Sequence, residues 1–195
     1  MKRSSFGAYL IVSAIAGLLV GIATVLGQGL LPGNWNSLAN SGAVWLVPAF
    51  FLGGIGTSKT RAAAGGVISL IGMVAGYYGY ARFVQHMPHS LYFVIVWLVA
   101  AVVGGVIFGL GGYLWGRKYG SALLGGVFVT EGLNIFLHEG YDHMHGFGAA
   151  ELVIGIALVL VIERSNWARF ISLAAMVPVV VLGLLGYGLL ASITG

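Results

Sequence analysis

The residues able to do chemistry gather in one short stretch, "FVTEGLNIFLHEGYDHMHG", which covers residues 128–146. It holds three of the five acids and three of the five histidines in the 195-residue chain. Carboxylates and imidazoles close together can transfer protons, bind a cation or hold a metal ion. Which of these applies depends on whether each side chain lies in water or in the membrane.

Glu131, Asn134 and His138 are spaced i, i+3 and i+7, which places them on one stripe of a helix. Glu131 lies roughly 10 Å along this helix from His138, and Glu151 lies roughly 7 Å into the next apolar run. The two acids are therefore expected at a similar depth on neighbouring antiparallel helices. An acid near the membrane centre costs about 2.5–3.5 kcal/mol unless it is protonated or paired. The structural alternatives are a hydrogen bond from Glu131 to Ser, Thr, Tyr or Asn on a neighbouring helix, and Asn134 bonding between helices.

The composition indicates that lipid surrounds most of the chain. Hydrophobic residues make up 59% of it, glycine contributes 33 residues and charged residues only 7%, whereas a soluble domain is about one-quarter charged. We predict a single integral membrane domain, residues 1–195, in contact with the lipid bilayer. The absence of cysteine excludes disulfides and thiolate chemistry.

The apolar runs predict an all-α, polytopic transmembrane bundle of about seven helices, or six if the first is a cleaved signal. The second run is short and contains Pro48, so a re-entrant segment is an alternative. The predicted spans are residues 6–26, 42–58, 62–84, 91–115, 122–139, 147–163 and 170–192.

The basic residues predict the orientation. With a cytoplasmic N-terminus, eight of the nine Lys and Arg residues lie inside and only Arg82 lies outside, as the positive-inside rule favours. The net charge of +4 is thus accounted for without a nucleic-acid partner. The eight residues are Lys2, Arg3, Lys59, Arg61, Arg117, Lys118, Arg164 and Arg169. Small residues on single faces, such as Gly17 with Gly21 and Gly72 with Gly76, predict close helix packing.

All five histidines map to the predicted outer side. "HMPH" (86–89) and "DHMHG" (142–146) carry ligand types that suit copper or zinc, but short histidine loops are usually just solvated, so a metal ion is not favoured and no other cofactor is identified. Titration near neutral pH is a separate alternative for these loops. The weak metal candidates are His86, His89, His138, Asp142, His143 and His145.

Aromatic residues also gather at the outer side. Interfacial Trp and Tyr usually anchor a protein in the membrane, yet aromatic walls with a few polar groups are also what a small-molecule pocket requires. We expect Glu131, Asn134, His138 and Glu151 to form the floor of such a pocket. Its candidate walls are Trp35, Trp45, Tyr77, Tyr78 and Tyr80.

The string "WNSLANSGAVW", followed by "PAFFLGG", resembles a signature of an uncharacterised family of small bacterial multi-pass membrane proteins, most closely over residues 28–56. In size and helix density the chain also resembles the substrate-capturing membrane subunits of energy-coupling-factor transporters, although it departs from their usual six helices. These resemblances imply a bacterial cytoplasmic membrane, and the second implies membrane or ATPase partner subunits.

The leading hypothesis is a membrane protein, not an enzyme, that binds or transports a small solute through an outward-facing polar and aromatic pocket. One alternative is a metal-dependent intramembrane enzyme, in which outer histidines hold an ion and Glu131 or Glu151 acts as general base on bound water. Another is a scaffold subunit that assembles with other membrane proteins through its glycine-lined faces.

Overall fold

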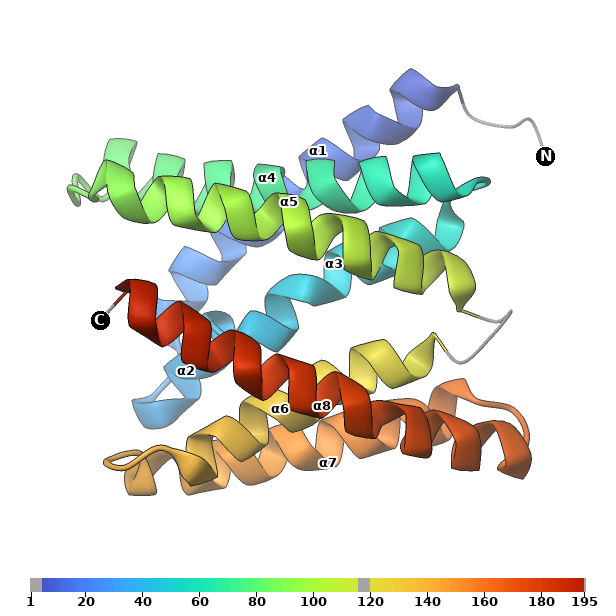
Figure 1. Ribbon diagram of the computed structural model, residues 1–195. Coiled ribbons are helices and arrows are strands. Elements are labelled where there is room, and N and C mark those ends of the chain that lie inside the picture. Colours follow the sequence, from blue (N-terminus) through green and yellow to red (C-terminus); the bar gives the residue numbers. More distant parts are fainter. Residues whose placement is uncertain (1–4, 116–119, 195) are drawn as a thin grey trace. The chain divides into compact units, whose positions relative to one another are not determined.

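The computed structural model describes residues 5–115 and 120–194 and is all-α, with no strand in either range (Figure 1). This confirms the predicted fold class. Four of the predicted cytoplasmic basic residues, Lys2, Arg3, Arg117 and Lys118, lie outside the described residues. The elements are α1 (Phe6–Leu30), η1 (Gly33–Trp35), α2 (Asn36–Ala39), α3 (Gly42–Ile55), α4 (Lys59–Phe83), α5 (Leu91–Leu114), α6 (Ser121–Leu137), η2 (Asp142–Met144), α7 (His145–Ile162) and α8 (Asn166–Thr194).

Six segments of the described chain are long and apolar enough to cross a membrane. Five contain α1, α4, α5, α7 and α8, and the sixth, Gly33–Ile55, joins η1 and α2 to α3, which has only 14 residues by itself. The remaining long helix, α6, has 17 residues and is shorter than these. Many large apolar side chains on the candidate spans are exposed, for example Val161 and Leu182, as expected of helices in contact with lipid.

The chain forms two compact units. The first unit comprises the residues up to Leu31 together with Trp45–Tyr113, and the second comprises Pro32–Val44 together with the residues from Leu114 onward. The single membrane domain expected over residues 1–195 stays a prediction.

In the first unit, α1 packs along α4 at points where the two backbones touch. A Cβ atom on Gly17 would lie 2.0 Å from the carbonyl oxygen of Ser69, and one on Gly21 would lie 2.1 Å from that of Met73. Gly72 and Gly76 approach α1 from the other side of the same contact. The small-residue faces predicted on these two segments are therefore packing surfaces.

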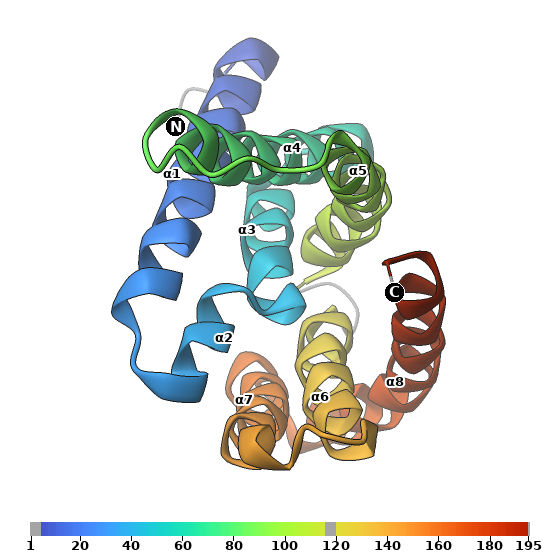
Figure 2. The ribbon, with the colours of Figure 1, turned by 90° about the vertical axis from the view of Figure 1, so that its left-hand side faces the viewer.

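In the second unit, α6 packs against both α7 and α8. α6 and α7 run side by side in both ribbon views (Figures 1 and 2). Glycines again make the contact: a Cβ on Gly125 would lie 2.6 Å from the carbonyl oxygen of Gly155, and one on Gly132 would lie 2.7 Å from that of Gly148. This close packing holds the middle of α6 against the first half of α7, where Glu131 and Glu151 lie.

We expect Gly125→Ala to lower the melting temperature of the purified protein. Its added methyl group would meet the Gly155 backbone and Val159 at 2.6 and 2.7 Å, and overpacking of this kind costs about 1–3 kcal/mol, or roughly 2–12 °C. The matched control is Gly186→Ala in α8, which has nothing within 4 Å and should leave the temperature unchanged or slightly higher, because alanine favours a helix over glycine. Thermal unfolding in detergent, followed by circular dichroism, measures both. Equal shifts in the two variants would contradict the close contact between α6 and α7.

Candidate functional site

Glu131 is held by residues from two other parts of the second unit, the segment Ser41–Ala43 and helix α8. One of its carboxylate oxygens, Oε2, accepts hydrogen bonds from the Ala43 backbone N–H at 2.7 Å and from the Ser41 hydroxyl at 2.9 Å. The hydroxyl of Tyr187 on α8 also donates a hydrogen bond to the carboxyl group. Glu131 on α6 thus joins the start of α3 to α8.

These hydrogen bonds place a carboxylate at the N-terminus of α3, where unpaired N–H groups and the helix dipole favour negative charge. Ser41 precedes the helix and accepts a hydrogen bond from the Val44 N–H at 3.1 Å, as an N-cap serine does. At Gly42, an added Cβ would lie 3.2 Å from the Tyr187 hydroxyl, so glycine leaves room for Tyr187 to approach. The neighbouring Ser and Tyr partners are those of the structural alternative considered for Glu131.

Glu151 on α7 has a different environment. Its side chain is fully buried, and neither of its carboxylate oxygens has a hydrogen-bond partner among the described residues. Glu131 lies within electrostatic reach of it, and the Ser41 hydroxyl is also near, but that hydroxyl donates its hydrogen to Glu131 at 2.9 Å. A buried polar group normally has a partner, because leaving it unpaired costs about 1–3 kcal/mol. Among the described residues, Glu151 is therefore the buried side chain whose polar atoms lack a hydrogen-bond partner.

The other two residues of the predicted stripe lie nearer the end of α6. Asn134 is half-buried on the helix. His138 follows the last helical residue, Leu137, and is exposed. Its ring stacks on Tyr141 with centroids 4.3 Å apart, and its Nδ1 atom lies 3.0 Å from the carbonyl oxygen of Glu139. Because α6 stops before His138, its position is set by the loop and not by the helical stripe.

A pocket of about 400 Å³ lies at the start of α7. Trp35 packs edge-on against Phe147 with ring centroids 6.3 Å apart, and the Asn34 side-chain amide donates a hydrogen bond to the His143 carbonyl. Phe147 lines this pocket and precedes Glu151 by one helical turn on the same face of α7. Its lining residues are Pro32, Gly33, Asn34, Trp35, His143, Gly146 and Phe147.

The other predicted wall residues belong to the first unit. Trp45 packs against Tyr77 with ring centroids 5.7 Å apart, and the Tyr77 hydroxyl donates a hydrogen bond to Gln28 at 3.2 Å. Tyr78 contacts Tyr77 and His89, whereas Tyr80 is half-buried. Of the five aromatic residues, Trp35 alone lies in the unit that holds Glu131 and Glu151.

Across residues 5–115 and 120–194, no group of three or more His, Asp or Glu side chains is arranged to hold a metal ion. His145 and Asp142 come within 3.6 Å of each other, and His145 also stacks on Phe136. His143 lies edge-on to Tyr141. His86 and His89 belong to the first unit, in the segment between α4 and α5.

Three residues that sequence reasoning did not select complete the site: Ser41, Phe147 and Tyr187. A serine directly before an apolar run is a recognisable N-cap signal, and it could have identified Ser41 as the start of a helix. Tyr187 is a hydroxyl-bearing residue within an apolar span, which is a weaker signal. Phe147 has no signal beyond its spacing of four residues from Glu151.

The helices and their composition define a polytopic α-helical membrane protein, with lipid as the neighbour of its transmembrane segments. The chain belongs to a family of unknown function, DUF6518, whose model matches residues 1–193. No curated protein and no solved structure matches the chain. The resemblance to energy-coupling-factor subunits stays a prediction.

Proposed function

We propose that this membrane protein binds, and passes through the membrane, a small cationic solute that interacts with Glu151. The observation that carries the proposal is the Glu151 carboxyl group, which is fully buried and without a hydrogen-bond partner among the described residues. An unpaired buried carboxyl group destabilises a fold, and a ligand that supplies the missing hydrogen-bond partner would account for its presence. Acidic residues within the membrane also commonly mark solute pathways.

A cation fits this environment better than a neutral or anionic solute. Glu131 and Glu151 lie close enough to act on one another electrostatically. Two ionised carboxylates at short range repel each other, so both are ionised together only when a positive charge lies beside them. A bound positive charge would relieve that repulsion and supply Glu151 with a donor. Glu131 already has Ser41, Ala43 and Tyr187 as partners, so we assign the direct contact to Glu151.

The pocket at the start of α7 supports a route to Glu151. Trp35 and Phe147 provide two aromatic rings there, and aromatic faces attract organic cations. Phe147 lies one turn before Glu151 on the same helix face, and we propose that the solute passes Phe147 on its way from the pocket to the acid. The predicted topology places this opening on the outer side of the membrane.

The test measures thermal stabilisation of the purified chain by small cations and by neutral molecules of matched shape. Choline is paired with 3,3-dimethyl-1-butanol and guanidinium with urea, all at millimolar concentrations. A cation at about 100 times its Kd would stabilise the protein by about 2.7 kcal/mol, or roughly 5–10 °C. A cation that stabilises the protein is then tested for uptake into proteoliposomes.

Two variants make the test specific to the site. Glu151→Gln should remove both the thermal shift and the uptake, because it removes the negative charge at nearly constant volume. The control is Glu139→Gln, which makes the same change at an exposed loop residue and should behave like the wild type. Equal shifts from the cations and their neutral partners, or an unchanged response in Glu151→Gln, would refute the proposal.

A further inference from the structure

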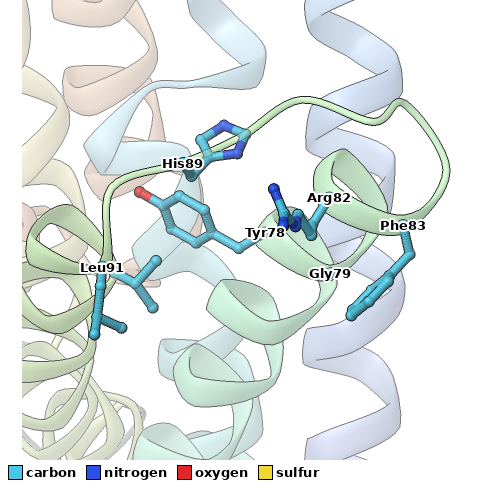
Figure 3. Close-up of a pocket in the computed structure, with 7 residues that line it drawn as sticks. Tyr78, Gly79, Arg82, Phe83, His89 and Leu91 are labelled. Atoms are coloured by element: carbon cyan, nitrogen blue, oxygen red, sulfur yellow. The ribbon is translucent and has the colours of Figure 1, made fainter.

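A second pocket, of about 300 Å³, lies in the first unit where α4 ends and α5 begins. Its polar lining comes from Tyr78, Arg82 and His89, and Figure 3 shows these three side chains grouped beside the connecting segment. Its apolar lining comes from Phe83, Leu91 and Val94. The pocket contains a cationic side chain and no acidic one.

The Arg82 side chain makes no hydrogen bond, ion pair or aromatic contact with the described part of the chain. It is exposed in the last turn of α4, where a basic side chain could satisfy the final carbonyl groups. Two of those carbonyls already have partners: Tyr80 accepts from the Val84 and Gln85 N–H groups, and Ala81 accepts from the Met87 N–H at 2.9 Å. The guanidinium group is therefore left for another partner.

The segment after α4 has a defined conformation that places His89 beside Arg82's pocket. His86 adopts a left-handed backbone, with φ of 55°, which residues other than glycine rarely adopt. His89 lies edge-on to Tyr78 with ring centroids 5.0 Å apart, and its Nδ1 atom lies 3.1 Å from the Met87 carbonyl oxygen. A carbonyl oxygen accepts, so Nδ1 carries the hydrogen. Nε2 can then accept a hydrogen bond from a P–OH group, or donate one to a phosphate oxygen when the ring is protonated.

These features favour a phosphate group attached to an apolar chain. Arginine binds phosphate through paired N–H donors, and the start of α5 adds the positive end of a helix dipole. α4 and α5 are both candidate membrane spans, so their shared end lies at the depth of lipid headgroups. Phe83 is 80% exposed and Leu91 is 70% exposed, which leaves both free to contact an acyl chain.

We propose that this pocket binds the phosphate group of an anionic amphiphile, with Arg82 and His89 at the phosphate and Phe83, Leu91 and Val94 against its acyl chain. The site is separate from Glu131 and Glu151 and does not depend on the proposed cation route. The positive-inside rule accounts for the other eight basic residues but not for Arg82, which is the one predicted to lie on the outer side. Phosphate binding would give Arg82 a role.

Calorimetric titration of the purified full chain in a neutral detergent tests the site with three probes: dihexanoyl phosphatidic acid, inorganic phosphate and dihexanoylglycerol, which lacks the phosphate. We expect phosphatidic acid to bind and Arg82→Gln to weaken it by about tenfold or more. The matched control is Arg164→Gln, which removes the same charge from an exposed residue in the connection between α7 and α8 and should leave binding unchanged.

A substitution in the apolar lining distinguishes a lipid phosphate from free inorganic phosphate as the ligand. If the ligand is a lipid, Phe83→Ala weakens phosphatidic acid but leaves inorganic phosphate unaffected. If inorganic phosphate binds as tightly as the lipid and Phe83→Ala changes neither, the acyl-chain part of the proposal is overturned. The whole site is overturned if Arg82→Gln and Arg164→Gln bind alike, or if dihexanoylglycerol binds as well as phosphatidic acid.

Discussion

Glu151→Leu is expected to make the protein more stable while abolishing its response to cations. The substitution replaces a fully buried carboxyl group that has no partner among the described residues with an apolar side chain of similar size. Removing the cost of an unpaired buried polar group would stabilise the fold by about 1–3 kcal/mol, which raises the melting temperature by roughly 2–12 °C. A gain in stability with a loss of function is typical of a residue kept for its activity.

Thermal unfolding with and without the stabilising cation measures both effects on one sample. Glu151→Gln provides an intermediate case, because it removes the charge but keeps polar atoms in the same buried position. The assignment of Glu151 fails if Glu151→Leu lowers the melting temperature markedly, since that would mean that the carboxyl group stabilises the fold.

Glu131→Leu is expected to have the opposite effect on stability. It would leave the Ser41 hydroxyl, the Ala43 N–H and the Tyr187 hydroxyl without the acceptor they share. Each buried donor left unpaired costs about 1–3 kcal/mol, so the loss of the acceptor for all three should lower the melting temperature by roughly 6 °C or more.

The same leucine substitution at two neighbouring acids thus separates a structural role from a binding role. Glu131→Gln keeps a carbonyl oxygen for the three donors and should cost less than Glu131→Leu. Thermal unfolding in detergent measures all of these variants. Shifts of the same sign in Glu131→Leu and Glu151→Leu would contradict the distinction between the two carboxyl groups.

Much of the fold could be predicted because membrane helices leave strong signals in composition. The apolar runs identified the segments of the seven long helices, and the glycines at positions 17, 21, 72 and 76 identified the contact between α1 and α4. The helix ends were less well predicted: α1 continues to Leu30 and α8 starts at Asn166. An apolar window detects the hydrocarbon layer, whereas a helix can continue into the headgroup region.

Less of the candidate site could be predicted. The helical rise predicted that Glu131 and Glu151 lie at a similar depth on one antiparallel pair of helices. It could not identify Ser41 or Tyr187 as partners of Glu131, since these residues reach it from α3 and α8 through tertiary packing. Which carboxyl group has partners and which has none depends on those contacts, and periodicity along a single helix carries no information about them.

The backbone contacts of the glycines also limit how this sequence can vary. Positions 17, 21, 125 and 155 each bring a Cβ site to 2.6 Å or less from a carbonyl oxygen of the facing helix, so no side chain fits without moving a helix. Gly7, Gly29, Gly186 and Gly188 have nothing within 4 Å and are free of this restriction. Across DUF6518 we therefore expect positions 17, 21, 125 and 155 to remain glycine and positions 7, 29, 186 and 188 to vary. The conserved glycines would then identify the positions at which two helices are in contact.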